Sequence, residues 1–143
     1  MDDGWEAFVW RHRLRMQPSN ANPLSWRWMA LYYKYVMARR PESAERYRPM
    51  LRLVEQLAES PLADRFRASL AMDDLIIALK PRREIGPNDP ALLVTSQWKT
   101  LDFRVEHHRG EGNGRLVSAC VVDGDGLRDC VEELIARVWP DDR

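Results

Sequence analysis

The most regular pattern of hydrophobic and polar residues in this chain lies between Ala91 and Trp139. Around its middle, successive side chains alternate between two faces, with Leu101, Phe103, Val105 and His107 on one face and Asp102, Arg104, Glu106 and His108 on the other. A period of two is typical of a strand with one packed face and one solvated face. With the apolar runs that flank it, this pattern predicts three strands, at about 92–98, 101–107 and 116–123.

The turns between these segments predict an antiparallel sheet. Lys99-Thr100 is expected to make a tight hairpin, and Gly110–Gly114 a looser one. The third strand is apolar on both faces, so we expect both to be covered. One face carries Leu116, Cys120 and Val122, and the other carries Val117, Ala119 and Val121.

A helix is predicted after the third strand. Apolar residues recur there at helical spacing until Pro140 ends the pattern, at Leu127, Cys130, Val131, Leu134, Ile135 and Val138. This single stripe predicts an amphipathic helix that packs against the sheet.

The N-terminal half is predicted to contain about four helices. The first covers about 3–16, the second begins with Ser25 as its N-cap, the third covers 44–58 and the fourth covers 62–79. Pro49 lies inside the third helix, so a kink or a split is expected there. The short run Leu75–Leu79 is equally compatible with a buried strand.

These elements predict a single α+β domain over residues 1–143. Its helical part (1–80) packs on a small antiparallel three-stranded sheet, and the C-terminal helix lies against that sheet within 91–139. Hydrophobic residues make up 45% of the 143 residues, which is sufficient for a core at this length.

Charge, cysteine content and the lack of a signal peptide indicate the expected subcellular location. The net charge is zero, although residues 1–50 hold nine Lys and Arg against five Asp and Glu, and the remainder has the opposite balance. The opening Met-Asp-Asp-Gly is unlike a signal peptide, and no apolar run is long enough to cross a bilayer. We therefore expect a cytoplasmic protein with no membrane contact. A Cys120–Cys130 disulfide could form if the helix lies over the third strand, but a cytoplasmic location disfavours it.

Candidate catalytic and metal sites are weak. His107, His108, Cys120 and Cys130 are zinc-ligand types, but their spacing matches no zinc motif. On a continuous helix Asp73 would share a face with Phe66, Leu70 and Ile77, which makes it a candidate for a hydrolase carboxylate, a buried ion pair or a helix cap. No nucleophile elbow or phosphate loop is present. We expect a protein that is not an enzyme and holds no cofactor or metal.

Two binding functions remain. Basic and aromatic residues alternate near the N-terminus, so a nucleic-acid-associated protein is the alternative, using Arg11, Arg13, Arg15, Trp26 and Arg27. The leading expectation is a non-catalytic protein-binding module, of the bacterial immunity or antitoxin type, that inhibits a partner such as a basic toxin domain by covering it. It would act as a monomer or homodimer. Its expected contact residues are Asp125, Asp129, Glu132, Glu133, Trp98, Arg104 and Glu106, although an ordinary solvated helix face would look the same.

Overall fold

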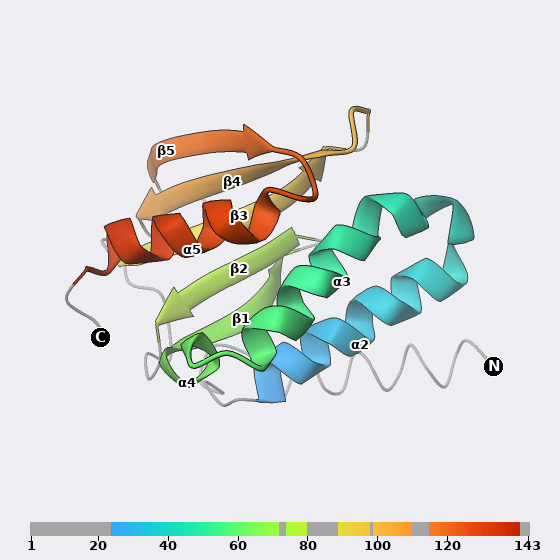
Figure 1. Cartoon of the computed structure of the whole chain (residues 1–143), viewed down its shortest axis with the longest axis horizontal. Coiled ribbons are helices and arrows are strands. Elements are labelled where there is room, and N and C mark those ends of the chain that lie inside the picture. Colours follow the sequence, from blue (N-terminus) through green and yellow to red (C-terminus); the bar gives the residue numbers. More distant parts are fainter. Residues whose placement is uncertain (1–23, 72–73, 80–88, 98, 110–114, 141–143) are drawn as a thin grey trace.

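The computed structural model describes residues 24–71, 74–79, 89–97, 99–109 and 115–140. Its helices are α2 (Leu24–Arg39), the 3-10 helix η1 (Pro41–Ser43), α3 (Ala44–Ala58), α4 (Leu62–Arg65) and α5 (Leu127–Val138). Its strands are β1 (Phe66–Ala71), β2 (Asp74–Leu79), β3 (Pro90–Gln97), β4 (Asp102–Arg109) and β5 (Arg115–Val122), as labelled in Figure 1. The predicted first helix lies outside the described residues.

The five strands form one antiparallel sheet in the order β1-β2-β3-β4-β5. The α+β class is therefore right, but the expected three-stranded sheet and wholly helical N-terminal half are wrong. Residues 62–79 form one turn of helix and a hairpin instead of a fourth long helix. Phe66, Ala68 and Leu70 alternate with polar residues, and Ile77 pairs with both Ala68 and Leu92. In a strand this alternation places Phe66, Ala68 and Leu70 on one face of the sheet.

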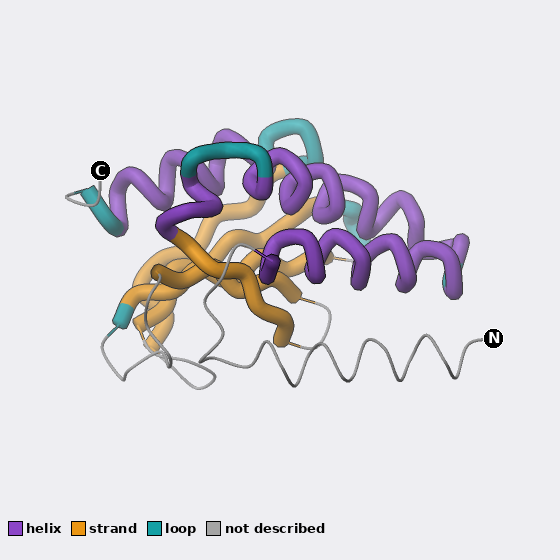
Figure 2. Tube along the Cα trace, turned by 90° about the horizontal axis from the view of Figure 1, so that it is seen from below, coloured by secondary structure: helices purple, strands orange, loops and turns teal. Residues whose placement is uncertain are grey.

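One face of the sheet, called here the inner face, carries the core. Figure 2 shows the helices gathered on one side of the strands. α5 packs on β4, α3 packs on β3, and α2 packs against α3 and β1. The largest inner-face side chains are fully buried, at Phe66, Leu75, Ile77, Leu92, Val94, Phe103 and Val105. Each such side chain contributes about 1.5–3 kcal/mol when it leaves water, so this layer is a large part of the hydrophobic stabilisation.

Pro49 lies inside α3 and contacts the turn between β5 and α5. The helix continues through this residue from Ala44 to Ala58, so the expected split is wrong. Pro49 packs against the turn between β5 and α5, where a methyl group added to Gly124 would lie 2.9 Å from the proline ring. The close approach explains a glycine at this turn, because any side chain there would force the turn away from α3.

The start of α2 closes the outer edge of β1. Trp26 is 1% exposed, and its indole Nε1 donates a hydrogen bond of 3.0 Å to the Phe66 carbonyl. The backbone N–H of Ala68 donates to Ser25 Oγ at 3.1 Å. Ser25 was expected to be an N-cap, but it lies inside α2 and instead satisfies a backbone group of the strand. Side chains of a helix thus occupy the hydrogen-bonding positions that an edge strand otherwise exposes.

The opposite edge is β5, which pairs only with β4 among the described residues. The pairing shifts register between His107 and His108, so that His107 faces Ser118 while His108 faces Leu116. Val117 is therefore the extra residue of a β-bulge. The bulge moves Leu116 to the face opposite Cys120 and Val122, which corrects the expected arrangement.

The turn between β3 and β4 is longer than the expected two-residue hairpin. Gln97 pairs with Asp102, so residues 98–101 connect the two strands. Leu101 closes this turn with a φ of 61° and donates its N–H to the Gln97 carbonyl at 2.9 Å. Its side chain is 46% exposed. A leucine in this left-handed conformation carries a backbone strain that little burial offsets.

Replacing Ser25 with alanine should lower the free energy of unfolding by about 1–3 kcal/mol, because the buried Ala68 N–H loses its acceptor. Urea denaturation of the purified variant measures the change. Ser118→Ala is the matched control, since Ser118 is exposed, and it should change stability by less than about 0.5 kcal/mol. Equal effects of the two substitutions would contradict this account of the β1 edge.

Replacing Leu101 with glycine should raise the free energy of unfolding by about 0.5–1 kcal/mol, because glycine adopts a positive φ without strain. Thermal melts followed by circular dichroism provide the measurement. Leu101→Val, which adds a branched Cβ at the same backbone position, should be destabilising. A glycine variant that melts below the wild type would show that the leucine side chain matters more than its backbone.

Candidate functional site

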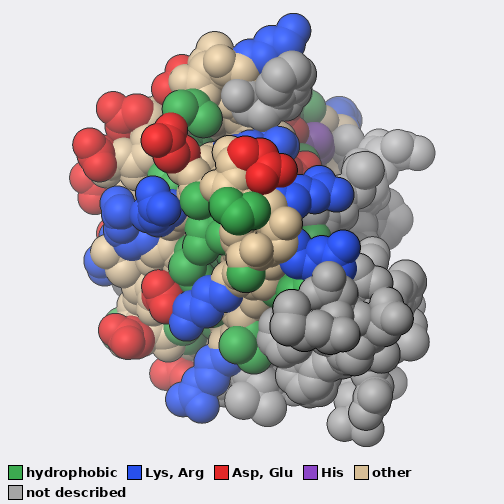
Figure 3. Space-filling model, turned by 90° about the vertical axis from the view of Figure 1, so that its right-hand side faces the viewer, with side chains coloured by type: hydrophobic (Ala, Val, Ile, Leu, Met, Phe, Trp, Pro, Cys, Tyr) green, Lys and Arg blue, Asp and Glu red, His purple; other side chains and the backbone are tan. Residues whose placement is uncertain are grey.

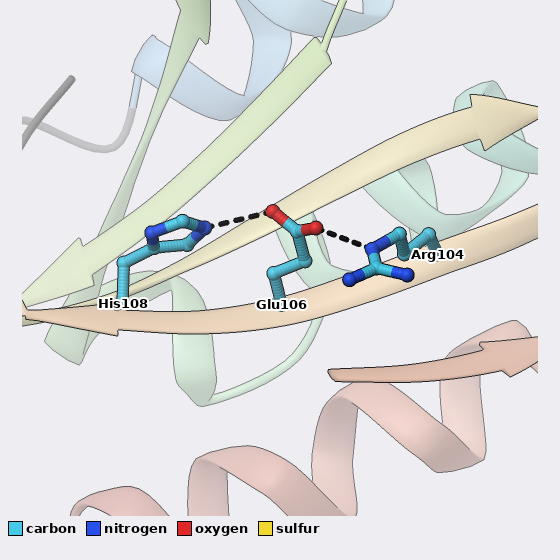
Figure 4. A network of polar contacts seen from close by, with 3 residues as sticks. All are labelled: Arg104, Glu106 and His108. Carbon is cyan, nitrogen blue, oxygen red and sulfur yellow. Dashed lines mark hydrogen bonds and ion pairs between the residues drawn. The ribbon is translucent and has the colours of Figure 1, made fainter. Parts of the chain in front are cut away.

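Three polar side chains of β4 form a connected row on the face of the sheet opposite the inner face. Arg104, Glu106 and His108 occupy alternate positions of the strand, so they point the same way. Glu106 Oε1 lies 2.7 Å from His108 Nε2, and Glu106 Oε2 accepts a hydrogen bond from Arg104 Nε. Figure 4 shows the carboxylate between its two partners. We call these three residues the polar row.

The carboxylate of Glu106 is held in its ionised form. Its side chain is 17% exposed, and burial alone would raise its pKa. The hydrogen bonds from His108 and Arg104 and the charges of both groups outweigh that effect, so the pKa of Glu106 lies below 4.5. The polar row thus contains a Glu106 carboxylate that is ionised at neutral pH.

The strand neighbours of His108 can be compared with those of a catalytic histidine. A carboxylate that orients an imidazole is one part of a hydrolase triad, which also needs a nucleophile beside the other ring nitrogen. Across the strands, His108 pairs with Ala91 and Leu116, neither of which carries a hydroxyl or thiol. Thr95 lies opposite Arg104, at the other end of the polar row. Strand pairing within the described residues therefore places no nucleophile next to this histidine.

An apolar strip runs along β5 beside the polar row. Val121, Ala119 and Leu116 lie opposite Arg104, Glu106 and His108 respectively. Leu116 is 46% exposed, Val117 is 48% exposed and Val121 is 52% exposed. Both faces of β5 were expected to be covered, and at these three positions that expectation is wrong. We call Leu116, Val117, Ala119 and Val121 the β5 strip.

The ends of the β5 strip carry opposite charges. Arg115 precedes it and is exposed, and it pairs with Arg109 at the end of β4. Asp125 follows it in the turn to α5 and is also exposed. An extended segment lying along β5 would therefore meet positive charge at one end, apolar side chains in the middle and negative charge at the other end.

The acidic face expected on α5 is partly neutralised within the helix. Glu132 accepts a hydrogen bond from Arg128 at 3.3 Å, and Glu133 accepts one from Arg137 at 2.9 Å. Such exposed pairs one turn apart contribute little to stability, but they place a positive charge beside each carboxylate. Asp129 is exposed in the first turn of the same helix. The expected contact residue Trp98 lies outside the described residues.

The residues of the nucleic-acid alternative do not form a stacking surface where the structure describes them. The Trp26 ring is buried, and its N–H donates a hydrogen bond to the Phe66 carbonyl. Arg27 is exposed, whereas residues 11, 13 and 15 lie outside the described residues. The face of the molecule in Figure 3 shows basic and acidic side chains intermixed among apolar ones. The phosphate backbone of a nucleic acid would require a positive field on the face that contacts it.

Two further candidate groups were Asp73 and His107. Asp73 is outside the described residues, and the continuous helix that would have aligned it with Phe66 and Ile77 is absent from residues 66–71 and 74–79. His107 is buried on the inner face, and its pKa is lowered by burial and by the charges of Arg109 and His108. A neutral imidazole at this position behaves as part of the core.

The described residues contain no group of three or more His, Cys, Asp or Glu side chains arranged to hold a metal ion. Cys120 and Cys130 do come together, with their sulfur atoms 2.7 Å apart.

Among the described helices, none is both long enough and apolar enough to cross a membrane. Comparison with protein-family models, curated proteins and solved structures finds no match to this chain.

Sequence reasoning named Arg104 and Glu106 but missed the β5 strip beside them. The missed signal was the lack of any charged residue between Leu116 and Val122. Central strands commonly lack charged residues over such a length, whereas edge strands usually carry charged side chains that prevent pairing with other chains. The run could be interpreted only after β5 was known to be an edge.

Replacing Glu106 with glutamine should lower the free energy of unfolding by about 1–2 kcal/mol near pH 7, because the bonds to Arg104 and His108 lose their charge. The folded-state pKa is below that of the unfolded chain, so the stabilisation is present above pH 4.5 and is lost as the pH falls through the folded-state value. The difference between variant and wild type should therefore shrink in acid.

Urea denaturation across a pH series provides the measurement. Glu59→Gln is the control, because Glu59 is exposed at the end of α3 and should give a small difference at every pH. A Glu106→Gln effect that stays constant from neutral to acid pH would contradict the assigned ionisation of this carboxylate.

Proposed function

We propose that this chain is a non-catalytic protein-binding module that pairs with an extended segment of a partner protein along β5. The observation that carries the proposal is the β5 strip, an edge strand whose apolar side chains are about half exposed. Addition of a strand to a sheet edge provides backbone hydrogen bonds for affinity and side-chain contacts for specificity.

The contrast between the two edges of the sheet supports this assignment. Ser25 and Trp26 bind the Ala68 N–H and the Phe66 carbonyl of β1, so two backbone groups of that edge are already paired within the chain. β5 has no charged side chain between Leu116 and Val122, and among the described residues the bulge at Val117 is the feature that interrupts its edge. Natural proteins seldom leave an apolar edge in this state unless it serves an interaction.

The charges around the β5 strip indicate the chemistry of the partner segment. Arg115 at one end favours an acidic residue, and Asp125 at the other favours a basic residue. The polar row lies one strand away, where Arg104 is 38% exposed and within reach of longer partner side chains. Asp129, on the helix that follows, extends the acidic end. We therefore propose a partner segment with apolar residues at its centre and opposite charges at its ends.

An inhibitor of the immunity or antitoxin type remains our proposal for the biological role. Such a protein acts by covering part of another protein. The edge strand β5 and the neighbouring Asp129 in the first turn of α5 together offer a surface suited to that role. Asp125, Asp129, Glu132 and Glu133 would then face basic groups of the partner, with the two glutamates exchanging their bonds to Arg128 and Arg137. The acidic residues would mainly increase the rate of association with a basic partner.

Replacing Val117 with lysine tests the proposed edge. The tagged chain is used to retain partners from extracts of the cells that produce it, and each partner is then titrated against purified wild type and variant. Lysine at an edge strand disfavours pairing with another strand, so affinity should fall at least about tenfold. Ala136→Lys, at an exposed position of α5, is the matched control and should bind as the wild type does.

Two results would contradict the proposal. The first is a partner whose affinity is the same for Val117→Lys and for the wild type. The second is a wild-type chain that light scattering shows to be a stable dimer lost in Val117→Lys, because β5 would then be occupied by a second copy. Circular dichroism of each variant confirms that its fold is unchanged before binding is compared.

A further inference from the structure

The contact between β5 and α5 contains the only two cysteines of the chain. Cys120 lies on the inner face of β5, opposite Val105, and Cys130 lies in α5 ten positions further along. Their sulfur atoms are 2.7 Å apart. A disulfide bond is about 2.05 Å long, so the two sulfurs need to approach by only about 0.7 Å to form one.

Both thiols are partly exposed, so a small reagent can reach them from solution. The strand and the helix that carry them are joined by a short turn in which the Gly126 N–H donates to Asp123 Oδ1 at 2.8 Å. Leu127 and Val131 of α5 are buried against the sheet, which fixes the helix beside the strand. The two cysteines are thus held together by the packing of the fold.

We propose that Cys120 and Cys130 form a reversible intramolecular disulfide that ties α5 to the edge strand β5. The oxidant is a low-molecular-weight disulfide such as oxidised glutathione. This modification site is independent of whether β5 binds a partner, although the bond would form directly behind the β5 strip and would stiffen it.

The order of the two steps follows from the environments of the thiols. Burial and the neighbouring Cys120 raise the pKa of Cys130 to about 12, so Cys130 keeps its proton at neutral pH. We therefore assign the first attack, on one sulfur of the oxidant, to Cys120. The oxidant's disulfide breaks, a mixed disulfide forms on Cys120, and one glutathione thiolate leaves.

The second step closes the bond. Cys130 loses its proton to solvent and attacks the Cys120 sulfur, and the second glutathione thiolate leaves. Two protein thiols have then been oxidised, and one molecule of oxidised glutathione has been reduced to two thiols. The hydrogen bond and charge of Cys120 that raised the pKa of Cys130 are absent from the mixed disulfide, which favours this step.

The test uses the full chain equilibrated with graded ratios of reduced and oxidised glutathione, trapped with an alkylating agent and measured by intact mass. The expected result is a monomer that loses both alkylation sites together in the more oxidising mixtures, with a peptide map that joins residues 120 and 130. Its melting temperature should rise on the order of 5–10 °C on oxidation, because the bond constrains the unfolded chain.

Two matched variants isolate the two thiols. Neither Cys130→Ser nor Cys120→Ser should show the paired loss of alkylation sites or the rise in melting temperature on oxidation. Peptide mapping of the wild type quenched early should find the glutathione adduct on residue 120, and an early adduct on residue 130 would overturn the assigned order. A wild-type chain that keeps both thiols free in excess oxidised glutathione, or that forms disulfide-linked dimers, would overturn the proposed bond. Neither readout involves a binding partner, so failure here is separable from failure of the β5 interface.

Discussion

An open sheet has two edges, and the backbone groups along both must be satisfied by water, by the chain itself or by another molecule. The two edges of the sheet in this protein differ in how their backbone groups are paired. At β1, the Ser25 hydroxyl and the Trp26 indole occupy backbone positions of Ala68 and Phe66. At β5, no described element takes that role. The difference between the edges determines which surface is available for interaction.

The same hydrogen bonds link the edge to the core. Trp26 and Ser25 are buried at the start of α2, so the helix that closes β1 is also held by the apolar layer beneath α3. At the opposite edge of the sheet, α5 follows β5 directly and folds back onto β4, on the same face as α2 and α3 (Figure 2). The edge strand is thereby supported from behind, while its apolar strip faces outward. A supported edge is a suitable binding surface because little of its order has to be gained on association.

The sequence predicted the second half of the fold better than the first. Alternation over 102–109 and the apolar stripe of α5 correspond to β4 and α5, because each has one buried side and one solvated side. Residues 66–71 were wrongly assigned to a helix, and Leu75–Leu79 was left open between helix and strand, since Phe66, Leu70 and Ile77 fit helical spacing as well as they fit two short strands. Only pairing with Leu92 and Val94, which are distant in sequence, decides between the two. Local periodicity contains no information about such pairing.

The candidate site was predictable in part for a similar reason. Arg104 and Glu106 stood out as polar residues on a solvated strand face, and they do form a connected group with His108. The exposure of Leu116, Val117 and Val121 was not predictable, because it depends on which strand lies at the edge and on the bulge at Val117. Trp26 was misinterpreted as a stacking residue because its buried hydrogen bond crosses from α2 to β1.

The unequal state of the two edges is tested most directly by amide hydrogen exchange, followed residue by residue by NMR in the free protein. The account predicts slow exchange at Ala68, whose N–H is bonded to Ser25, and fast exchange at alternate amides of β5, where no partner strand is present. Uniformly slow exchange along β5 in the free monomer would contradict an open edge, and fast exchange at Ala68 would contradict a closed one.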